Sequence, residues 1–213
     1  MSTLQKVLLA PNGRSISLNT GLFINNEFTA GSGNQILSIN PANGEEITKV
    51  EAASARDIDK AVGAARQAFN SPDWHNIAPA TRGSLLNKLA DLVREERETL
   101  ATLETWDNGK PYSIALEEDL SEVETALRYY AGWADKIVGS TMYKAGIEQK
   151  KLAYTIKQPI GVCALVIPWN YPLGSWPLSF LLEDMETVVL IMRGRNGCLE
   201  TWTRDRLWQH CCT

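Results

Sequence analysis

The chain has 213 residues, of which 44% are hydrophobic and 22% charged, and its formal net charge is -4. This composition is typical of a globular protein with one sizeable core or two small ones, and it excludes a chain that is disordered throughout. The acidic balance, with no stripe of basic residues before Asp184, argues against a nucleic-acid partner.

The first 20 residues are interpreted as an N-terminal extension. Their only apolar run, residues 7–10, is too short for the core of a secretion signal and far too short to span a bilayer, so we expect no membrane association. The four cysteines lack the spacing of a disulfide framework, which is typical of a reducing compartment. We therefore expect a cytoplasmic protein.

Residues 22–50 alternate short apolar runs with turn residues. Asn25-Asn26, Gly31-Ser32-Gly33 and Asn43-Gly44 separate these runs, a pattern typical of strands joined by hairpins. The sequence therefore predicts a small antiparallel strand apron.

Three helices are predicted after the apron. Ser54 caps the first, whose apolar residues recur with a helical period and stop before the next proline. Trp74 and His75 are expected in a loop, and the second helix is expected to begin at Thr81. The third helix stops at Gly109, which is suited to a left-handed cap, with a proline just beyond.

The longest periodic stretch, residues 113–137, predicts one helix that is closed by Gly139. Its acidic residues are interpreted as a solvated face without a catalytic role, although such clusters can also supply paired catalytic carboxylates; they are Glu117, Glu118, Glu122 and Glu124. The alternation of apolar and polar residues over 151–157 then predicts a strand.

Residues 161–167 form an uncharged run that predicts a strand buried on both faces of a parallel sheet. Pro168 ends the strand, and Pro172 stiffens the turn that carries Trp169 and Asn170. Ligands of open α/β sheets bind at the carboxyl ends of the strands. The Asn170 amide is a donor of the kind that stabilises an oxyanion, and the alternative is a turn residue that bonds its own backbone.

Several short motifs occur in an order that one enzyme family shares. They are residues 23–28, 40–45, 57–62, 103–111, 128–134 and 168–172, the last of which is proline, tryptophan, asparagine, an aromatic residue and proline. Over roughly residues 20–175 the chain resembles the NAD(P)-dependent aldehyde dehydrogenase superfamily. The resemblance implies an α/β fold, with residues 21–191 as a partial dinucleotide-binding domain. That domain would hold an incomplete doubly wound parallel sheet, flanking helices and the strand apron.

The resemblance also implies a chemistry. In this family a cysteine thiolate attacks the aldehyde, hydride passes to NAD or NADP, and a glutamate-activated water releases the acid. It implies that Asn170 donates to the oxyanion and that Ile167, Pro168, Trp169 and Asn170 line the cofactor groove. The nucleophile and the base belong to motifs beyond residue 213, and Cys163 is expected to be an inert thiol within its strand. We therefore expect neither turnover nor firm cofactor binding by these 213 residues alone.

The pattern changes near the C-terminus. Residues 187–190 predict a second strand, and Ile191 stands where the family carries a lysine that contacts the adenosine portion of the cofactor. Residues 192–213 show no period and are expected to be a disordered tail, produced by readthrough or mis-splicing. No metal site is predicted there, because the four candidate ligands lack zinc-site spacing; they are Cys198, His210, Cys211 and Cys212.

Three functional interpretations follow. The first is an oxidoreductase of this family, which binds an aldehyde and a dinucleotide and forms a homo-oligomer. The second is a non-catalytic oligomerisation or regulatory segment, which associates with full-length homologues through its helices and the strand at 151–157. The third is a truncation product of a gene-model error.

Overall fold

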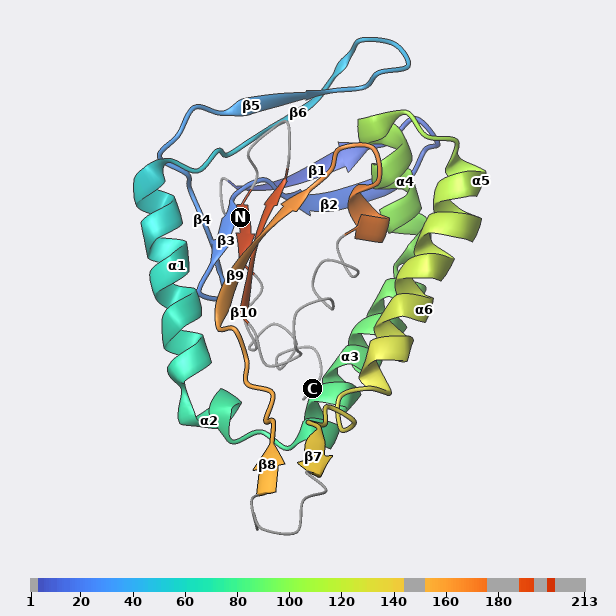
Figure 1. The fold of residues 1–213 in the computed structure, drawn as a ribbon. Coiled ribbons are helices and arrows are strands. Elements are labelled where there is room, and N and C mark those ends of the chain that lie inside the picture. Colours follow the sequence, from blue (N-terminus) through green and yellow to red (C-terminus); the bar gives the residue numbers. More distant parts are fainter. Residues whose placement is uncertain (1–3, 144–151, 176–187, 194–198, 202–213) are drawn as a thin grey trace.

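The computed structural model describes residues 4–143, 152–175, 188–193 and 199–201. Its largest sheet has the strand order β4-β3-β11-β10-β9. These strands are β3 (Leu22–Ile24), β4 (Glu27–Thr29), β9 (Val162–Ile167), β10 (Val188–Arg193) and β11 (Leu199–Thr201). β9 and β10 are parallel, so the second predicted strand is confirmed. β11 is antiparallel to β10 and parallel to β3, and helices flank this mixed sheet, which gives the predicted α/β fold (Figure 1).

Two of the predicted hairpins are confirmed, but they belong to different sheets. β3 and β4 are joined by Asn25 and Asn26, which both have positive φ, at 52° and 65°, as a tight two-residue hairpin requires. β5 (Ile36–Ile39) and β6 (Glu46–Val50) form a separate antiparallel pair that projects from the top of the molecule in Figure 1. The apron is therefore not one sheet.

The first 20 residues hold a hairpin that sequence analysis missed. β1 (Gln5–Leu9) and β2 (Ser15–Asn19) pair in antiparallel register, and Ile16 of β2 is 2% exposed. Lys6 Nζ donates a 2.9 Å hydrogen bond to Thr48 Oγ1 of β6. This part of the chain is therefore packed into the fold, although its short apolar runs carried no clear strand signal.

The helices at residues 55–108 largely follow the prediction. They are α1 (Ala55–Asn70), α2 (Pro72–His75), α3 (Pro79–Glu95) and α4 (Arg97–Asn108). Ser54 and Asp57 form a capping box at α1, and Gly109 ends α4 with a φ of 82°. The loop predicted at Trp74 and His75 was wrong. Both residues lie in α2, because a proline at the first helical position has a suitable φ and needs no N–H partner.

The single helix predicted over residues 113–137 was wrong in its continuity and its end. The structure has α5 (Tyr112–Ile114), the π-helical η1 (Ala115–Asp119) and α6 (Leu120–Ala131). Gly132, not Gly139, follows the last helical residue. The apolar period continues past this end because Ala134, in the following turn, is still only 2% exposed. Periodicity alone therefore placed the end too late.

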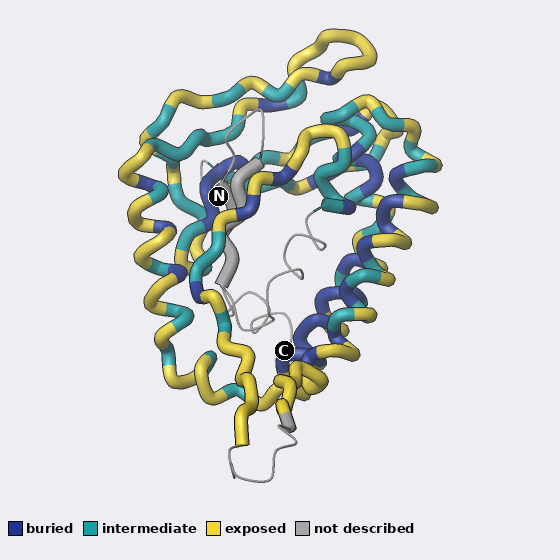
Figure 2. Tube along the Cα trace, viewed as in Figure 1, coloured by how far each residue is buried: buried dark blue, intermediate teal, exposed yellow. Residues whose placement is uncertain are grey.

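The main core lies among the helices. α3 and α6 run side by side (Figure 1), and their buried residues form one cluster with residues of α4 and η1, coloured dark blue in Figure 2. Gly83 allows the close approach, because an added Cβ would lie 2.6 Å from the Ala131 carbonyl oxygen. α1 packs on the sheet instead, against β9, β10 and β11. Within the described part of the chain, no helix combines the length and the apolarity that crossing a membrane requires.

Two strand predictions near the sheet need correction. Leu165 and Ile167 of β9 are buried, but Val166 is 68% exposed, so the strand is not buried on both faces. A parallel strand is buried twice only when both sheet faces are covered, and here one face of β9 is open. The strand predicted at 151–157 is shorter: β8 (Leu152–Tyr154) pairs with β7 (Thr141–Tyr143) in a ribbon apart from the main sheet.

The C-terminal stretch expected to be disordered from residue 192 contains parts of two strands. β10 continues to Arg193, and β11 lies between β10 and β3. Residues 192–193 and 199–201 thus lie in strands, and the disordered tail stays a prediction for the remainder of residues 192–213.

Candidate active site

Asn170 lies on an exposed turn directly after the carboxyl end of β9, as predicted from the prolines around it. Pro168 and Asn170 are exposed, and Trp169 is 53% exposed. The neighbouring strand β10 ends at the same level, because Arg193 pairs with Ile167. Two parallel strands therefore present their carboxyl ends side by side, the edge at which α/β sheets hold ligands.

The other predicted residues of this edge differ in how much surface they offer. Ile167 is 3% exposed, so it forms the floor of the edge rather than a contact surface. Cys163 is half-buried near the start of β9, where it pairs with Val189 of β10. A thiol at this position in the strand ladder lies away from the carboxyl end of the strand, and its inert role stays a prediction.

Residues 171–174 connect this turn to the helices. Tyr171 places its ring over Lys110, with Nζ 4.2 Å from the ring centroid, and its hydroxyl donates a hydrogen bond to Glu122. Leu173 packs against the main helical core. Figure 1 shows the turn after β9 extending to the region of α4 and α5. The segment that follows Asn170 is therefore attached to a different layer of the fold from the strand that precedes it.

Lys110 is itself held by buried carboxylates. Its Nζ forms an ion pair with Asp119 and lies 3.8 Å from Glu104 Oε1. The Asp119 and Glu104 side chains are each 2% exposed, and the Lys110 side chain is 16% exposed. The π-helical turn ends at Asp119, which brings that carboxylate to the start of α6. The cation thus neutralises a carboxylate that the helices bury.

The Tyr171 phenol is kept protonated by its surroundings. Burial raises its pKa above the ordinary value, and the hydrogen bond to Glu122 and the negative charge of Asp119 raise this pKa further. A protonated hydroxyl is the form that can donate to Glu122, and the raised pKa extends this form to a higher pH than in an ordinary tyrosine.

Sequence analysis did not identify these contacts. It treated Glu122 as part of a solvated face, and the structure shows that this residue accepts the Tyr171 hydroxyl although it is exposed. Glu117 and Glu118 are exposed, in agreement with the prediction, while Glu124 accepts hydrogen bonds from Arg128. No sequence signal pairs residues 110, 119 and 171, because their proximity depends on how the helices pack against the turn.

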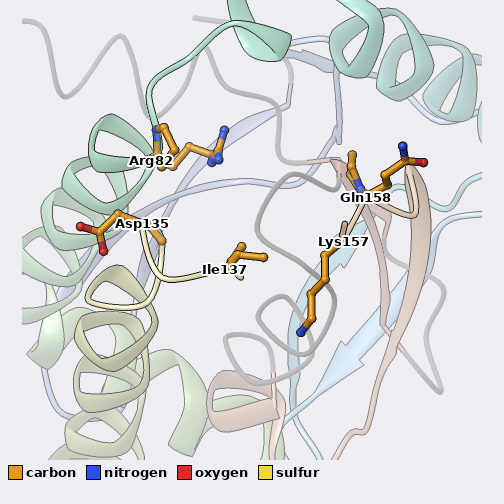
Figure 3. Close-up of a pocket in the computed structure, with 8 residues that line it drawn as sticks. Arg82, Asp135, Ile137, Lys157 and Gln158 are labelled. Carbon is orange, nitrogen blue, oxygen red and sulfur yellow. The ribbon is translucent and has the colours of Figure 1, made fainter. Parts of the chain in front are cut away.

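A cavity of about 150 Å³ lies elsewhere, between the start of α3, the turns after α6 and residues 157–159 (Figure 3). Its polar lining comes from Arg82, Asp135, Lys157 and Gln158. Arg82 is 6% exposed and donates a 3.2 Å bond to the Ile77 carbonyl, and Asp135 pairs with Lys136. None of the predicted site residues lines this cavity. We therefore place the candidate site at the end of β9.

Two predictions concern residues of which the side chains are not described. The backbone of Ile191 lies within β10 and pairs with Leu165, two residues before the strand ends. The tail residues considered as metal ligands lie outside the described residues; they are Cys198, His210, Cys211 and Cys212.

Comparison with known proteins identifies the family. The model of the aldehyde dehydrogenase family matches residues 28–180. An aldehyde dehydrogenase of Emericella nidulans is 47% identical over 173 residues, which cover 80% of this chain and 34% of that protein. The chain belongs to the aldehyde dehydrogenase family. The human mitochondrial aldehyde dehydrogenase is 45% identical over 186 residues, which cover 85% of this chain and 35% of the human protein.

Solved aldehyde dehydrogenase structures share the fold. The NAD+ complex of the aldehyde dehydrogenase from Bacillus cereus matches with a TM-score of 0.78 at 37% identity, covering 90% of this chain and 38% of that one. This chain therefore spans about a third of the length of the aldehyde dehydrogenases it matches. Residues 168–170 are exposed at the carboxyl end of β9, the edge at which open α/β sheets hold ligands.

Proposed function

We propose that this chain supplies the oxyanion-binding edge of an NAD(P)-dependent oxidation of an aldehyde to a carboxylic acid. The observation that carries the proposal is the exposed Asn170 turn at the joint carboxyl ends of β9 and β10, in a chain of the aldehyde dehydrogenase family. An uncharged amide can donate to an oxygen on which negative charge develops without adding charge of its own. Asn170 therefore has the role of oxyanion donor.

The cofactor contacts belong to the same edge. Pro168, Trp169 and Asn170 offer exposed surface to the dinucleotide, and Ile167 supports them from below. NAD or NADP accepts the hydride when bound. The residues of this chain bind and orient the dinucleotide and the aldehyde but do not supply the nucleophile, because Cys163 lies within the strand ladder. The 213 residues alone are therefore expected to be inactive, and their compartment is expected to be the cytoplasm.

A chimaera tests the role of Asn170. Residues 4–175 replace the matching segment of the Emericella nidulans aldehyde dehydrogenase, and NAD+ reduction by a simple aldehyde is measured. Asn170→Ala is expected to lower kcat by about 10²- to 10³-fold with little change in KM, as for loss of one oxyanion donor. Asn43→Ala is the matched control, because Asn43 bonds only residues of its own exposed turn among those described. A kcat within twofold of the parent chimaera would refute the role.

The inactivity of the separate chain has its own test. The purified 213-residue protein is incubated with aldehyde and either NAD+ or NADP+, with and without a thiol-alkylating reagent. No dinucleotide reduction is expected. Turnover that alkylation abolishes would show that a cysteine of this chain is a working nucleophile, contrary to the proposal.

A second candidate function is association with another copy or with a full-length homologue. The ribbon of β7 and β8 and the residues that follow it expose large apolar side chains: Met142 is 62% exposed, Leu152 74%, Tyr154 61% and Ile156 70%. Contiguous exposed apolar residues are typical of interaction surfaces. The molar mass in solution, measured by light scattering, should fall toward the monomer in Leu152→Lys and Ile156→Lys. An unchanged mass would remove this ribbon as the contact.

A further inference from the structure

Asn170 has no anchor of its own in the described structure. Among the residues that the structure describes, none forms a hydrogen bond with the Asn170 side chain, and the residue is exposed. A catalytic donor must nevertheless be held close to its productive position before the reaction begins. The position of this amide therefore depends on the backbone on either side of it.

The side that precedes Asn170 is only partly constrained. β9 ends at Ile167, and Pro168 has a fixed φ but no N–H with which to pair. Trp169 is 53% exposed and Asn170 is exposed. The residues that follow Asn170 offer a further constraint.

The side that follows Asn170 is attached firmly to the helices. Tyr171 lies with its ring over Lys110 and its hydroxyl on Glu122, so that it contacts two separate parts of the fold, the loop after α4 and helix α6. Lys110 is fixed in turn by Asp119 and Glu104, two buried carboxylates. The Lys110 backbone N–H also donates a 2.7 Å bond to Asn108 Oδ1.

Two further contacts fix the same segment. Leu173 packs on the main helical core, and the Ser175 N–H donates a 2.9 Å bond to the Tyr171 carbonyl oxygen. Gly174 lies directly against the Tyr171 ring, because an added Cβ there would overlap the ring atoms. The ring is therefore confined between Lys110 and Gly174.

We propose that Tyr171 is a positioning residue that holds the Asn170 amide in place by clamping the turn to Lys110 and Glu122. The proposal rests on the proposed function, because the position of Asn170 matters for catalysis only if its amide is the oxyanion donor. We call the contacts of Tyr171 with Lys110 and Glu122 the tyrosine clamp. The raised pKa of the Tyr171 phenol agrees with a hydroxyl that remains a donor at neutral pH.

The test measures the order of Asn170 directly in the full 213-residue chain. Backbone ¹⁵N relaxation gives the order parameter of Asn170, with the signal assigned as the one that moves most in Asn170→Asp. We expect a value near 0.85 in the parent chain, typical of a rigid backbone, and a value below about 0.6 in Tyr171→Ala. Tyr171→Phe, which keeps the ring and loses only the hydroxyl, should give an intermediate value.

Conservative variants separate positioning from general stability. Glu122→Gln keeps an oxygen that accepts the hydroxyl and should retain the parent order parameter, whereas Glu122→Leu should match Tyr171→Phe. Tyr154→Phe is the control, because Tyr154 is 61% exposed on β8, away from the turn. The melting temperature of Tyr171→Phe should stay within a few degrees of the parent, so that a change at Asn170 cannot be ascribed to unfolding.

The clamp is refuted if Asn170 has the same order parameter in Tyr171→Phe, Glu122→Leu and the parent, or if Asn170 is already mobile in the parent. These results are independent of turnover. If Asn170 is not the oxyanion donor, the Asn170→Ala chimaera should instead have an unchanged kcat. Failure of the clamp and failure of the proposed function are therefore distinguishable.

Discussion

Lys110→Met tests the buried ion pair that supports the candidate site. The substitution keeps an unbranched apolar side chain of similar length but removes the charge beside Asp119, which is 2% exposed in its side chain. Removing one partner of a buried ion pair costs roughly 3–5 kcal/mol, because the remaining charge is left without compensation. The Lys110 side chain is still 16% exposed, so we expect a loss near the lower end, about 3 kcal/mol.

The loss is measurable by urea and by thermal denaturation, each followed by circular dichroism. For a domain of this size, 1 kcal/mol corresponds to roughly 2–4 °C in melting temperature, so the thermal midpoint should fall by about 6–12 °C. Adding Asp119→Asn in the Lys110→Met background removes one of the two uncompensated carboxylate charges, with that of Glu104 remaining, and should restore part of the stability. Lys136→Met is the control, because Lys136 pairs with Asp135 at an exposed site and such pairs contribute about 0–1 kcal/mol.

A free energy of unfolding of Lys110→Met within 1 kcal/mol of the parent would contradict a buried ion pair, because a loss of that size is expected for an exposed pair. Simple addition of the effects of Lys110→Met and Asp119→Asn would contradict it as well. Additivity is the behaviour of residues that do not interact.

Three other outcomes are expected. Leu127→Ala, at a site 1% exposed in the helical core, should lower the free energy of unfolding by about 3 kcal/mol in the same urea assay. Gly109→Ala should lower the free energy of unfolding by about 1–2 kcal/mol, since φ is 82° and the new Cβ would meet Pro41 Cγ at 2.8 Å. Gly63→Ala in α1 is the control: an added Cβ there has no atom within 4 Å, so the substitution should be neutral or stabilising. The hydrogen bonds from Ser32, then those from Ser54, lower the pKa of Asp57 below its ordinary 3.8. The contribution of Asp57 to folding stability is therefore complete above pH 3.8 and is lost as the pH falls further. Asp57→Asn should make stability fall less steeply with decreasing pH in the acid range. An equally steep fall in the variant would contradict this expectation.

Local signals predicted the elements that depend on local chemistry. The cap at Ser54, the left-handed stop at Gly109 and the uncharged run at residues 161–167 each carried their own signal, and the structure has the corresponding elements. A second strand was also predicted over residues 187–190, and β10 (Val188–Arg193) confirms it. The Asn170 turn at a sheet terminus followed from the flanking prolines.

Elements that depend on distant partners were not predictable. The hairpin at residues 5–19 is anchored by Lys6 on Thr48, a contact that no local pattern encodes. The π-helical turn ends at Asp119, whose partner Lys110 lies beyond a helix stop. The contact of Tyr171 with Glu122 joins residues of different layers, and an exposed acidic residue usually has no such partner.

The position of β11 has a consequence for biosynthesis. Phe23 pairs with Glu200, so strand β3 meets its inner neighbour only after the chain has been made as far as residue 200. At ordinary translation rates this delay is on the order of 10 s or more. During that interval the β3–β4 hairpin presents an unpaired backbone edge, which is a template for incorrect pairing with other nascent chains. Chaperones that shield such edges are therefore expected to act on this chain before its release.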